Sequence, residues 1–190
     1  MCEKSGGENI PATNATINKT DSLETLRAPT LDDGADVWTL IKETGVLDLN
    51  SSYSYLMWCT NFSDTSVVIE TDDEIVGFIS GFIKPASPEK LFIWQVAVAE
   101  SERGKGLASK MLHHILERDV CENVRYVEAT VSPSNIPSRK LFNGLARNLD
   151  TNIEVFDCFT AEDFPEQGHE DELTHQIGPF KERKRLDQPR

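Results

Sequence analysis

The sequence lacks the features that identify zinc proteins, redox proteins and membrane proteins. Its cysteines lie far apart and form no C-x-x-C pair, so neither a metal site nor a redox motif is expected. No apolar run approaches the roughly 20 residues of a membrane span, and the first residues show no apolar signal region. We therefore expect a cytoplasmic protein with reduced thiols and no bound metal.

Basic residues are also scarce. The chain has 19 Lys and Arg against 32 Asp and Glu, a formal net charge of -13, whereas a general nucleic-acid binder needs a basic face. An acidic surface is ordinarily just solvated, but it also attracts small cationic ligands.

The length of 190 residues and the 38% of hydrophobic residues fit one compact domain. Residues 1–22 are polar and without periodicity, and we expect them to form a mobile tail. Residues 179–190 are expected to form a charged tail, which leaves residues 23–178 as the domain.

Helical and strand patterns alternate within this domain. Thr30 is expected to cap a helix with Asp33 at the capping-box distance, and Gly45 to end it. Its expected apolar side comprises Leu31, Val37, Trp38 and Ile41.

A second helix is expected to follow residue 50, with Tyr53, Leu56 and Met57 along one face. The acidic turn at residues 71–74 predicts a β-hairpin, and the apolar run at 91–99 a central strand. A helix over 105–119, a strand over 124–131, a helix over 134–146 and two closing strands complete the pattern. We expect an α/β fold with a mixed, mostly antiparallel central sheet and helices on both faces.

A glycine turn, Arg103-Gly104-Lys105-Gly106, connects the central strand to the following helix. A helix start presents free N–H groups, and glycines let a ligand approach the backbone closely, so an anionic ligand could bind there. The spacing fits neither a Walker A loop nor a G-x-G-x-x-G fingerprint. A plain strand-to-helix turn is the simpler alternative.

The residues from Arg103 to Ala108 resemble the R/Q-x-x-G-x-G/A acetyl-CoA motif of the GNAT acyltransferase superfamily. They also stand where that superfamily has it, between its fourth strand and third helix. Downstream, "TVSPSNIPSRKLFNGLA" resembles the superfamily's strand followed by N-x-x-(A/S)-x-x-L-(Y/F). Order, spacing and both motifs agree over about residues 23–160.

The resemblance implies how acetyl-CoA would bind. Val96 and Val98 would pair with the pantetheine arm, an N–H near Val96 would stabilise the thioester oxygen during the reaction, and Asn135 and Ser138 would touch the arm. The pyrophosphate would bind the turn formed by Arg103, Gly104, Lys105, Gly106, Leu107 and Ala108. Phe142 stands where many members have the tyrosine that protonates the leaving thiolate.

Three segments lie where the superfamily binds the acyl acceptor, and they show a closer resemblance to one group of its members. These segments are "LRAPTLDDGADVW", "ETGVLDLNSSYSYLMWC" and "FPEQGHEDELTHQIGPF". They are similar to the members that acetylate the γ-amine of L-2,4-diaminobutyrate in ectoine biosynthesis, and this similarity implies that reaction and a homodimer.

The residue chemistry suits a diamino acid, whose two amines need anionic partners and whose carboxylate needs donors. Candidates for the amines are Asp33, Asp48, Glu70 and Glu170. Candidates for the carboxylate are Asn50, Ser52, Tyr53 and Trp94, with His169 near the pocket mouth. Each also has a structural alternative: a cap or turn for Asp33, Asp48 and Asn50, the core for Trp94, and solvent for His169 and Glu170.

The expected mechanism is direct attack in a ternary complex, with Glu70 or Asp33 accepting the amine proton, directly or through water. An acyl-cysteine route has less support, because no cysteine has an evident histidine partner. Two other functions stay open at this level. One is acetylation of a polyamine, an aminoglycoside or a protein amine, and the other is a non-catalytic acyl-CoA sensor.

Overall fold

The structure is a computed structural model, and it describes residues 23–165 and 167–180. The expected tail at 1–22 lies outside these residues, as does most of the expected tail at 179–190. Phe180 belongs to the domain, because its backbone N–H donates to the carbonyl of Arg125 at 3.0 Å.

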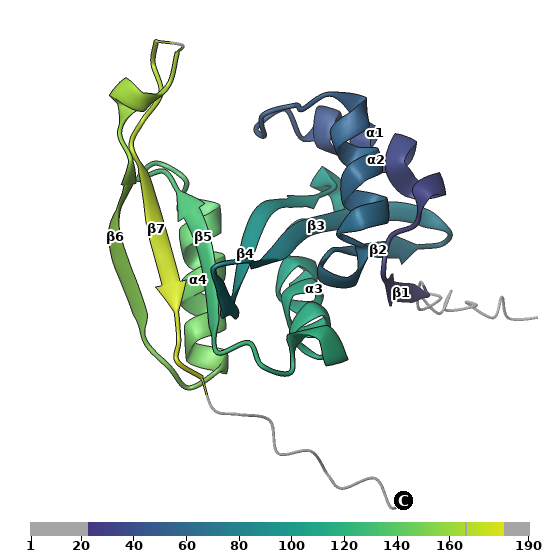
Figure 1. Cartoon of the computed structure of the whole chain (residues 1–190). Helices are drawn as coiled ribbons and strands as arrows, with labels where there is room; N and C mark the ends of the chain where they lie inside the picture. The colour runs from purple at the N-terminus through teal and green to yellow at the C-terminus, as the bar shows by residue number, and fades with distance from the viewer. Residues whose placement is uncertain (1–22, 166, 181–190) are drawn as a thin grey trace, which may run out of the picture.

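Seven strands of the described chain form one sheet in the order β1-β2-β3-β4-β5-β7-β6, and each neighbouring pair is antiparallel except β4 and β5 (Figure 1). The strands are β1 (Glu24–Arg27), β2 (Val67–Thr71), β3 (Glu74–Lys84), β4 (Ser87–Val98), β5 (Tyr126–Val131), β6 (Ile153–Phe159) and β7 (Glu172–Ile177). The α-helices are α1 (Gly34–Thr44), α2 (Ser52–Asn61), α3 (Leu107–Leu116) and α4 (Ile136–Asn148). Short 3-10 turns are η1 (Leu31–Asp33), η2 (Ser63–Thr65), η3 (Glu100–Glu102), η4 (Asp119–Cys121) and η5 (Ala161–Asp163).

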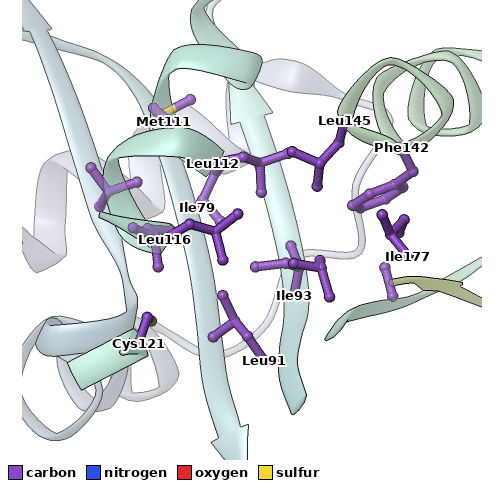
Figure 2. Packing of buried hydrophobic residues seen from close by; sticks show 14 of the residues in the cluster. Ile79, Leu91, Ile93, Met111, Leu112, Leu116, Cys121, Phe142, Leu145 and Ile177 are labelled. Carbon is purple, nitrogen blue, oxygen red and sulfur yellow. The ribbon is translucent and has the colours of Figure 1, made fainter. Parts of the chain in front are cut away.

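The helices cover both faces of the sheet, which confirms the predicted α/β architecture. Helices α1 and α2 pack on one face against Val68, Phe78 and Ala97. Helices α3 and α4 pack on the other face, where Leu112 and Leu145 lie close together (Figure 2). Neighbouring strand residues point to opposite faces, so β2, β3 and β4 supply both cores.

The predicted hairpin between β2 and β3 is present. Asp72 and Asp73 both have positive φ, 51° and 66°. Positive φ at both central residues is the type I′ geometry, whose twist matches that of the flanking strands.

The helix expected after residue 50 is present as α2, but it does not bury the face that carries Tyr53 and Leu56. Tyr53 is 68% exposed and Leu56 is also exposed, whereas Tyr55 and Cys59, one helical turn apart, are buried. Apolar side chains occur almost all round α2, so the sequence pattern did not single out one face, and packing on α1 and the sheet decided it. Leu31 is exposed as well, because it lies in η1 before α1 begins.

Candidate active site

Strands β4 and β5 pair at one end and separate at the other. Their parallel ladder runs from Lys90 to Phe92 on β4, yet β4 continues to Val98 and β5 to Val131. Figure 1 shows the two strands diverging beyond this ladder. The edge of β4 beyond Phe92 thus has free backbone groups that an extended ligand with amide groups can pair with.

The N–H groups of Val96 and Val98 point to this open edge. The Ala99 N–H donates to the Val76 carbonyl at 2.8 Å, and the Gln95 N–H donates to Ser80 Oγ at 3.2 Å, both toward β3. Because backbone groups alternate between the two edges of a strand, the intervening Val96 and Val98 face away from β3. The structure thus orients these two residues as the family resemblance implies, and their contacts with a coenzyme stay predictions.

An ionic cluster holds the closed end of the two strands. Glu128 on β5 is buried and accepts hydrogen bonds of 2.7 Å from Lys84 on β3 and Lys90 on β4. Lys90 also donates to Gln176 on β7 at 2.7 Å. Burial raises the pKa of Glu128, but the hydrogen bonds from the two lysines outweigh it and leave the pKa below its ordinary value. The cluster ties four strands together where the ladder ends.

A β-bulge at Trp94 redirects the side chains of β4. Ser80 pairs with Gln95 and Gly81 pairs with Ile93, so Trp94 is the extra residue. Ile93 points into the α3–α4 core, whereas Trp94 is 55% exposed and lies beside the ring of Trp58 at 6.2 Å between centroids. A Cβ on Gly81 would lie 2.8 Å from the Phe92 carbonyl oxygen, so this close approach requires glycine.

Gln95 follows the bulge and anchors the loop between α1 and α2. Its Nε2 donates to the carbonyl oxygen of Asp48 at 2.9 Å. Its Oε1 is buried and accepts no hydrogen bond from the residues that the structure describes. Sequence reasoning missed this residue, because a glutamine inside an apolar run gives no sign that the loop after α1 will reach it.

The glycine turn has the geometry of an anion site. Gly104 and Gly106 have φ of +79° and +81°, and the space where a Cβ would stand is open at both. Gly106 directly precedes α3, and no side chain caps the first N–H groups of that helix. Leu107 is buried and half-buried Ala108 follows it, so the backbone rather than the side chains faces a ligand. The positive end of α3 is therefore open to an anion.

The two basic residues of the turn are exposed. Lys105 pairs with Glu102 at 2.7 Å, and Arg103 Nε donates to the Val98 carbonyl at 3.3 Å. Because both basic side chains are exposed, they can release these partners for a phosphate at little cost.

The start of α4 is capped by the predicted coenzyme residues themselves. Asn135 Oδ1 accepts the N–H of Ser138 at 3.1 Å. Phe142, one turn further, is buried beside Leu145 and Ile177 and offers no proton to the site (Figure 2). Coenzyme contacts of Asn135 and Ser138 stay predictions.

Acidic residues from two distant loops gather near the ends of β4 and β5. Burial raises the pKa of Glu172, and the carboxylates of Asp48 and Glu170 raise it further. A hydrogen bond with Ser132 and the nearby His169 act in the opposite direction. These residues are therefore close neighbours, although Asp48 and Glu172 are 124 positions apart in the sequence.

The loop before β7 is held in place by contacts of Glu170 and of His169. The Ser134 N–H donates to Glu170 Oε2 at 3.1 Å, and the His169 ring stacks on Phe164 with centroids 4.3 Å apart. Glu172, the first residue of β7, was missed by sequence reasoning. It is half-buried in the folded chain, and its neighbours Ser132 and Asp48 are distant in the sequence. A possible signal was its position two residues after Glu170.

Asp33 and Glu70 lie elsewhere and share Arg27. Asp33 forms two bonds of 2.7 Å to the guanidinium of Arg27, and Glu70 Oε1 accepts from Arg27 Nε at 3.0 Å. Hydrogen bonding from Arg27 holds the pKa of Asp33 below its ordinary value. Asp33 directly precedes α1, whose 11 residues span about 16 Å, and Asp48 lies in the loop that follows this helix.

The remaining acceptor candidates line the start of α2. The Asn50 N–H donates to the hydroxyl of Tyr55 at 3.2 Å, which closes the loop that carries Asp48. Ser52 and Tyr53 are exposed at the first turn of α2. Their contacts with a substrate stay predictions.

The thiols give no support to a covalent route. Burial raises the pKa of Cys59 to about 12, so this thiol is not a nucleophile at neutral pH. Cys121 is buried, and Cys158 lies exposed on β6. In the described residues no group of three His, Cys, Asp or Glu side chains is placed to hold a metal ion, and none of the helices there is long and apolar enough to cross a bilayer.

Comparison with known proteins shows the family of this chain. The profile of the Acetyltransferase (GNAT) family matches residues 35–145. The L-2,4-diaminobutyric acid acetyltransferase of Virgibacillus pantothenticus is 57% identical over 153 residues, which cover 80% of this chain and 96% of that protein. The protein of the same name from Marinococcus halophilus is 54% identical over 152 residues, 80% of this chain and 88% of that one.

A solved structure is also similar. Diaminobutyrate acetyltransferase EctA from Paenibacillus lautus, in complex with its substrate L-2,4-diaminobutyric acid and coenzyme A, has a TM-score of 0.81. It is 46% identical, and the match covers 84% of this chain and 97% of that chain. The chain studied here therefore belongs to the acetyltransferase (GNAT) family.

Proposed function

We propose that this enzyme transfers the acetyl group of acetyl-CoA to the γ-amine of L-2,4-diaminobutyrate, a step of ectoine biosynthesis. The relatives that bear this activity in their names are up to 57% identical and match along most of their length. The observation in this chain that carries the proposal is the group of carboxylates at Asp48, Glu170 and Glu172, beside the open edge of β4. Three carboxylates beside one another suit a ligand with two ammonium groups.

Acetyl-CoA is proposed to bind along β4 and the start of α3. Its pyrophosphate would lie against the free N–H groups after Gly106, and its pantetheine arm would pair with Val96 and Val98. The Val96 N–H would then face the thioester oxygen and stabilise the negative charge that develops there.

The amine must lose a proton before it attacks. With a pKa near ~10, only about one amine in a thousand is neutral at pH 7. We assign proton acceptance to Glu172, because its raised pKa makes it a better base than Asp33. The neutral nitrogen forms a bond to the acetyl carbon, the carbon–sulfur bond breaks, and the nitrogen gives up its extra proton, which reaches the leaving thiolate through water.

Two further features belong to this proposal. The enzyme is proposed to act in the cytoplasm, where acetyl-CoA is available and where Cys59, Cys121 and Cys158 stay reduced. It is also proposed to be a homodimer, as the family resemblance implies.

The test is an amine panel. The purified protein is incubated with acetyl-CoA and one amine at a time, and free thiol is measured. Turnover is expected with 2,4-diaminobutyrate, with the acetyl group on the γ-nitrogen by NMR. Faster turnover with a polyamine, an aminoglycoside or a peptide would contradict the proposal. Thermal stabilisation by acetyl-CoA without turnover of any amine would indicate a non-catalytic acyl-CoA sensor instead.

A further inference from the structure

Gln95 of β4 is a buried polar side chain that leaves its acceptor oxygen unused. The residue is only 7% exposed. Its Nε2 donates to the Asp48 carbonyl at 2.9 Å, whereas its buried Oε1 accepts no hydrogen bond from the residues that the structure describes. A buried carbonyl oxygen without a donor is costly, so native proteins keep one chiefly where a water or a ligand supplies the donor.

The surroundings fix the orientation of the Gln95 amide. A backbone carbonyl can only accept, so the amide nitrogen must face Asp48 and the amide oxygen must point away from that carbonyl. The backbone is held as well, because the Gln95 N–H donates to the Oγ of buried Ser80 at 3.2 Å. The unused oxygen therefore has a set position in the fold.

The β-bulge turns Gln95 toward the acceptor side of the sheet. Ala97, two residues further along β4, belongs to the core under α1 and α2. Gln95 reaches the loop after α1, and Trp94 lies beside Trp58 of α2. Both residues at the bulge thus face the α1–α2 side, where the loop that carries Asp48 lies.

The unused oxygen suits an ammonium group that keeps its proton. Asp48 is a close neighbour of Glu172, the proposed acceptor of the γ-amine proton, so Gln95 lies on the same side of the site. The γ-amine has to become neutral before it attacks, whereas the α-ammonium group stays charged. A glutamine oxygen accepts a hydrogen bond without taking up the proton, and a bond from a charged donor is among the strong ones.

We propose that Gln95 is a specificity-determining residue, whose Oε1 accepts a hydrogen bond from the α-ammonium group of 2,4-diaminobutyrate. This bond holds the α-nitrogen away from the thioester and leaves the γ-nitrogen to react near the N–H of Val96. An amine without an α-ammonium group would leave Oε1 buried and unpaired, and sites built around a hydrogen bond discriminate strongly against such analogues. The inference rests on the proposed reaction and adds the reason why only one of the two amines is acetylated.

A pair of substrates tests this hydrogen bond. 4-Aminobutyrate has the carboxylate and the γ-amine of 2,4-diaminobutyrate and lacks only the α-amine. With acetyl-CoA, kcat/KM is measured for both by mass spectrometry of the acetylated product. The wild type should prefer 2,4-diaminobutyrate by about 100-fold or more. Gln95→Leu should reduce this preference about 10-fold, by lowering kcat/KM for 2,4-diaminobutyrate and not for 4-aminobutyrate.

Two further variants separate the hydrogen bond from effects on the loop. Gln95→Met is unbranched like glutamine and should behave as Gln95→Leu does, so it serves if a branched side chain disturbs the bulge. Tyr55→Phe removes the other anchor of the loop after α1, at Asn50, and should keep the wild-type preference. Thermal stabilisation by acetyl-CoA shows that each variant is folded.

The unaltered protein can already contradict the inference. Equal kcat/KM for the two substrates in the wild type would overturn it without any variant. An unchanged preference in folded Gln95→Leu and Gln95→Met would also overturn it, and would mean that a water occupies the place beside Oε1. In both cases the proposed reaction would stand, because 2,4-diaminobutyrate is still acetylated. Absence of any turnover with 2,4-diaminobutyrate would instead overturn the reaction and this inference with it.

Discussion

Gln95 on β4 is hydrogen-bonded to the carbonyl of Asp48, so the bulge of the central strand and the loop after α1 form one unit. The Oε1 of the same Gln95 side chain is buried and accepts no hydrogen bond from the described residues. The bulge therefore positions an acidic loop and an unused acceptor together.

We expect the free Oε1 of Gln95 to accept a hydrogen bond from an ammonium group of the substrate. Gln95→Leu should therefore raise KM for 2,4-diaminobutyrate about 10-fold, because a hydrogen bond to a charged group contributes about 1.5 kcal/mol. KM for acetyl-CoA should change little. Tyr55→Phe is the control, since it removes the other anchor of the same loop, at Asn50, and leaves Gln95 intact. Equal effects of the two variants would mean that Gln95 only anchors the loop and does not accept from the amine.

Gly106→Ala should raise KM for acetyl-CoA by 10-fold or more. A side chain at φ +81° costs about 1–2 kcal/mol of backbone strain, and it also stands where the pyrophosphate would approach. Gly45→Ala is a matched control, because Gly45 has φ +63° and equally open surroundings at the end of α1. Both variants should lose similar stability by thermal unfolding, and similar losses of coenzyme affinity would contradict the anion site.

Glu172→Gln should lower kcat by about 10²- to 10⁴-fold, the usual contribution of a general base. In the wild type, kcat should rise with pH as Glu172 ionises, at a pH above the ordinary glutamate pKa because its pKa is raised. This limb of the pH profile should disappear in the variant. Glu162→Gln, an exposed acid of η5, should behave as wild type.

Glu172→Gln should increase thermal stability at pH 7, although it lowers kcat. A carboxyl group whose pKa is raised by folding favours the protonated form, so its stabilisation is present at low pH and is lost as pH rises through the folded pKa. Glu172→Gln should therefore unfold at a higher temperature than wild type at pH 7. Lower stability together with lower kcat would indicate a structural role.

Asp33→Asn should lower stability at pH 7 by about 2 kcal/mol, because Asp33 forms an ion pair with Arg27. With Glu172 as the proposed proton acceptor, kcat should stay within about 3-fold of wild type. Its pKa is lowered by folding, so its stabilisation exists above the ordinary aspartate pKa and is lost as pH falls through the folded pKa. Denaturant unfolding at pH 7 and pH 3 measures this. A 100-fold loss of kcat with unchanged stability would restore Asp33 as the proton acceptor.

Local patterns in the sequence determined much of the fold and one half of the site. The glycine turn needs positive φ at Gly104 and Gly106, and the buried face of α3 repeats with the period of a helix. Both properties follow from short-range sterics and periodicity. For that reason the sequence could predict the α/β order and the glycine turn before α3, and the binding of an anion at this turn stays a prediction.

Tertiary structure alone decided the other half of the site, which is the acidic group on the acceptor side. Asp48 and Glu172 meet because the loop after α1 and the start of β7 reach the same end of the sheet. The pKa of Glu172 is raised first by its burial and then by the carboxylates of Asp48 and Glu170. Arg27 on β1 forms two ion pairs, one with Asp33 in η1 and one with Glu70 on β2. No local sequence pattern predicts these contacts. Desolvation and charge–charge interaction depend on distance in space, so the protonation chemistry of this site is a property of the folded chain rather than of any segment.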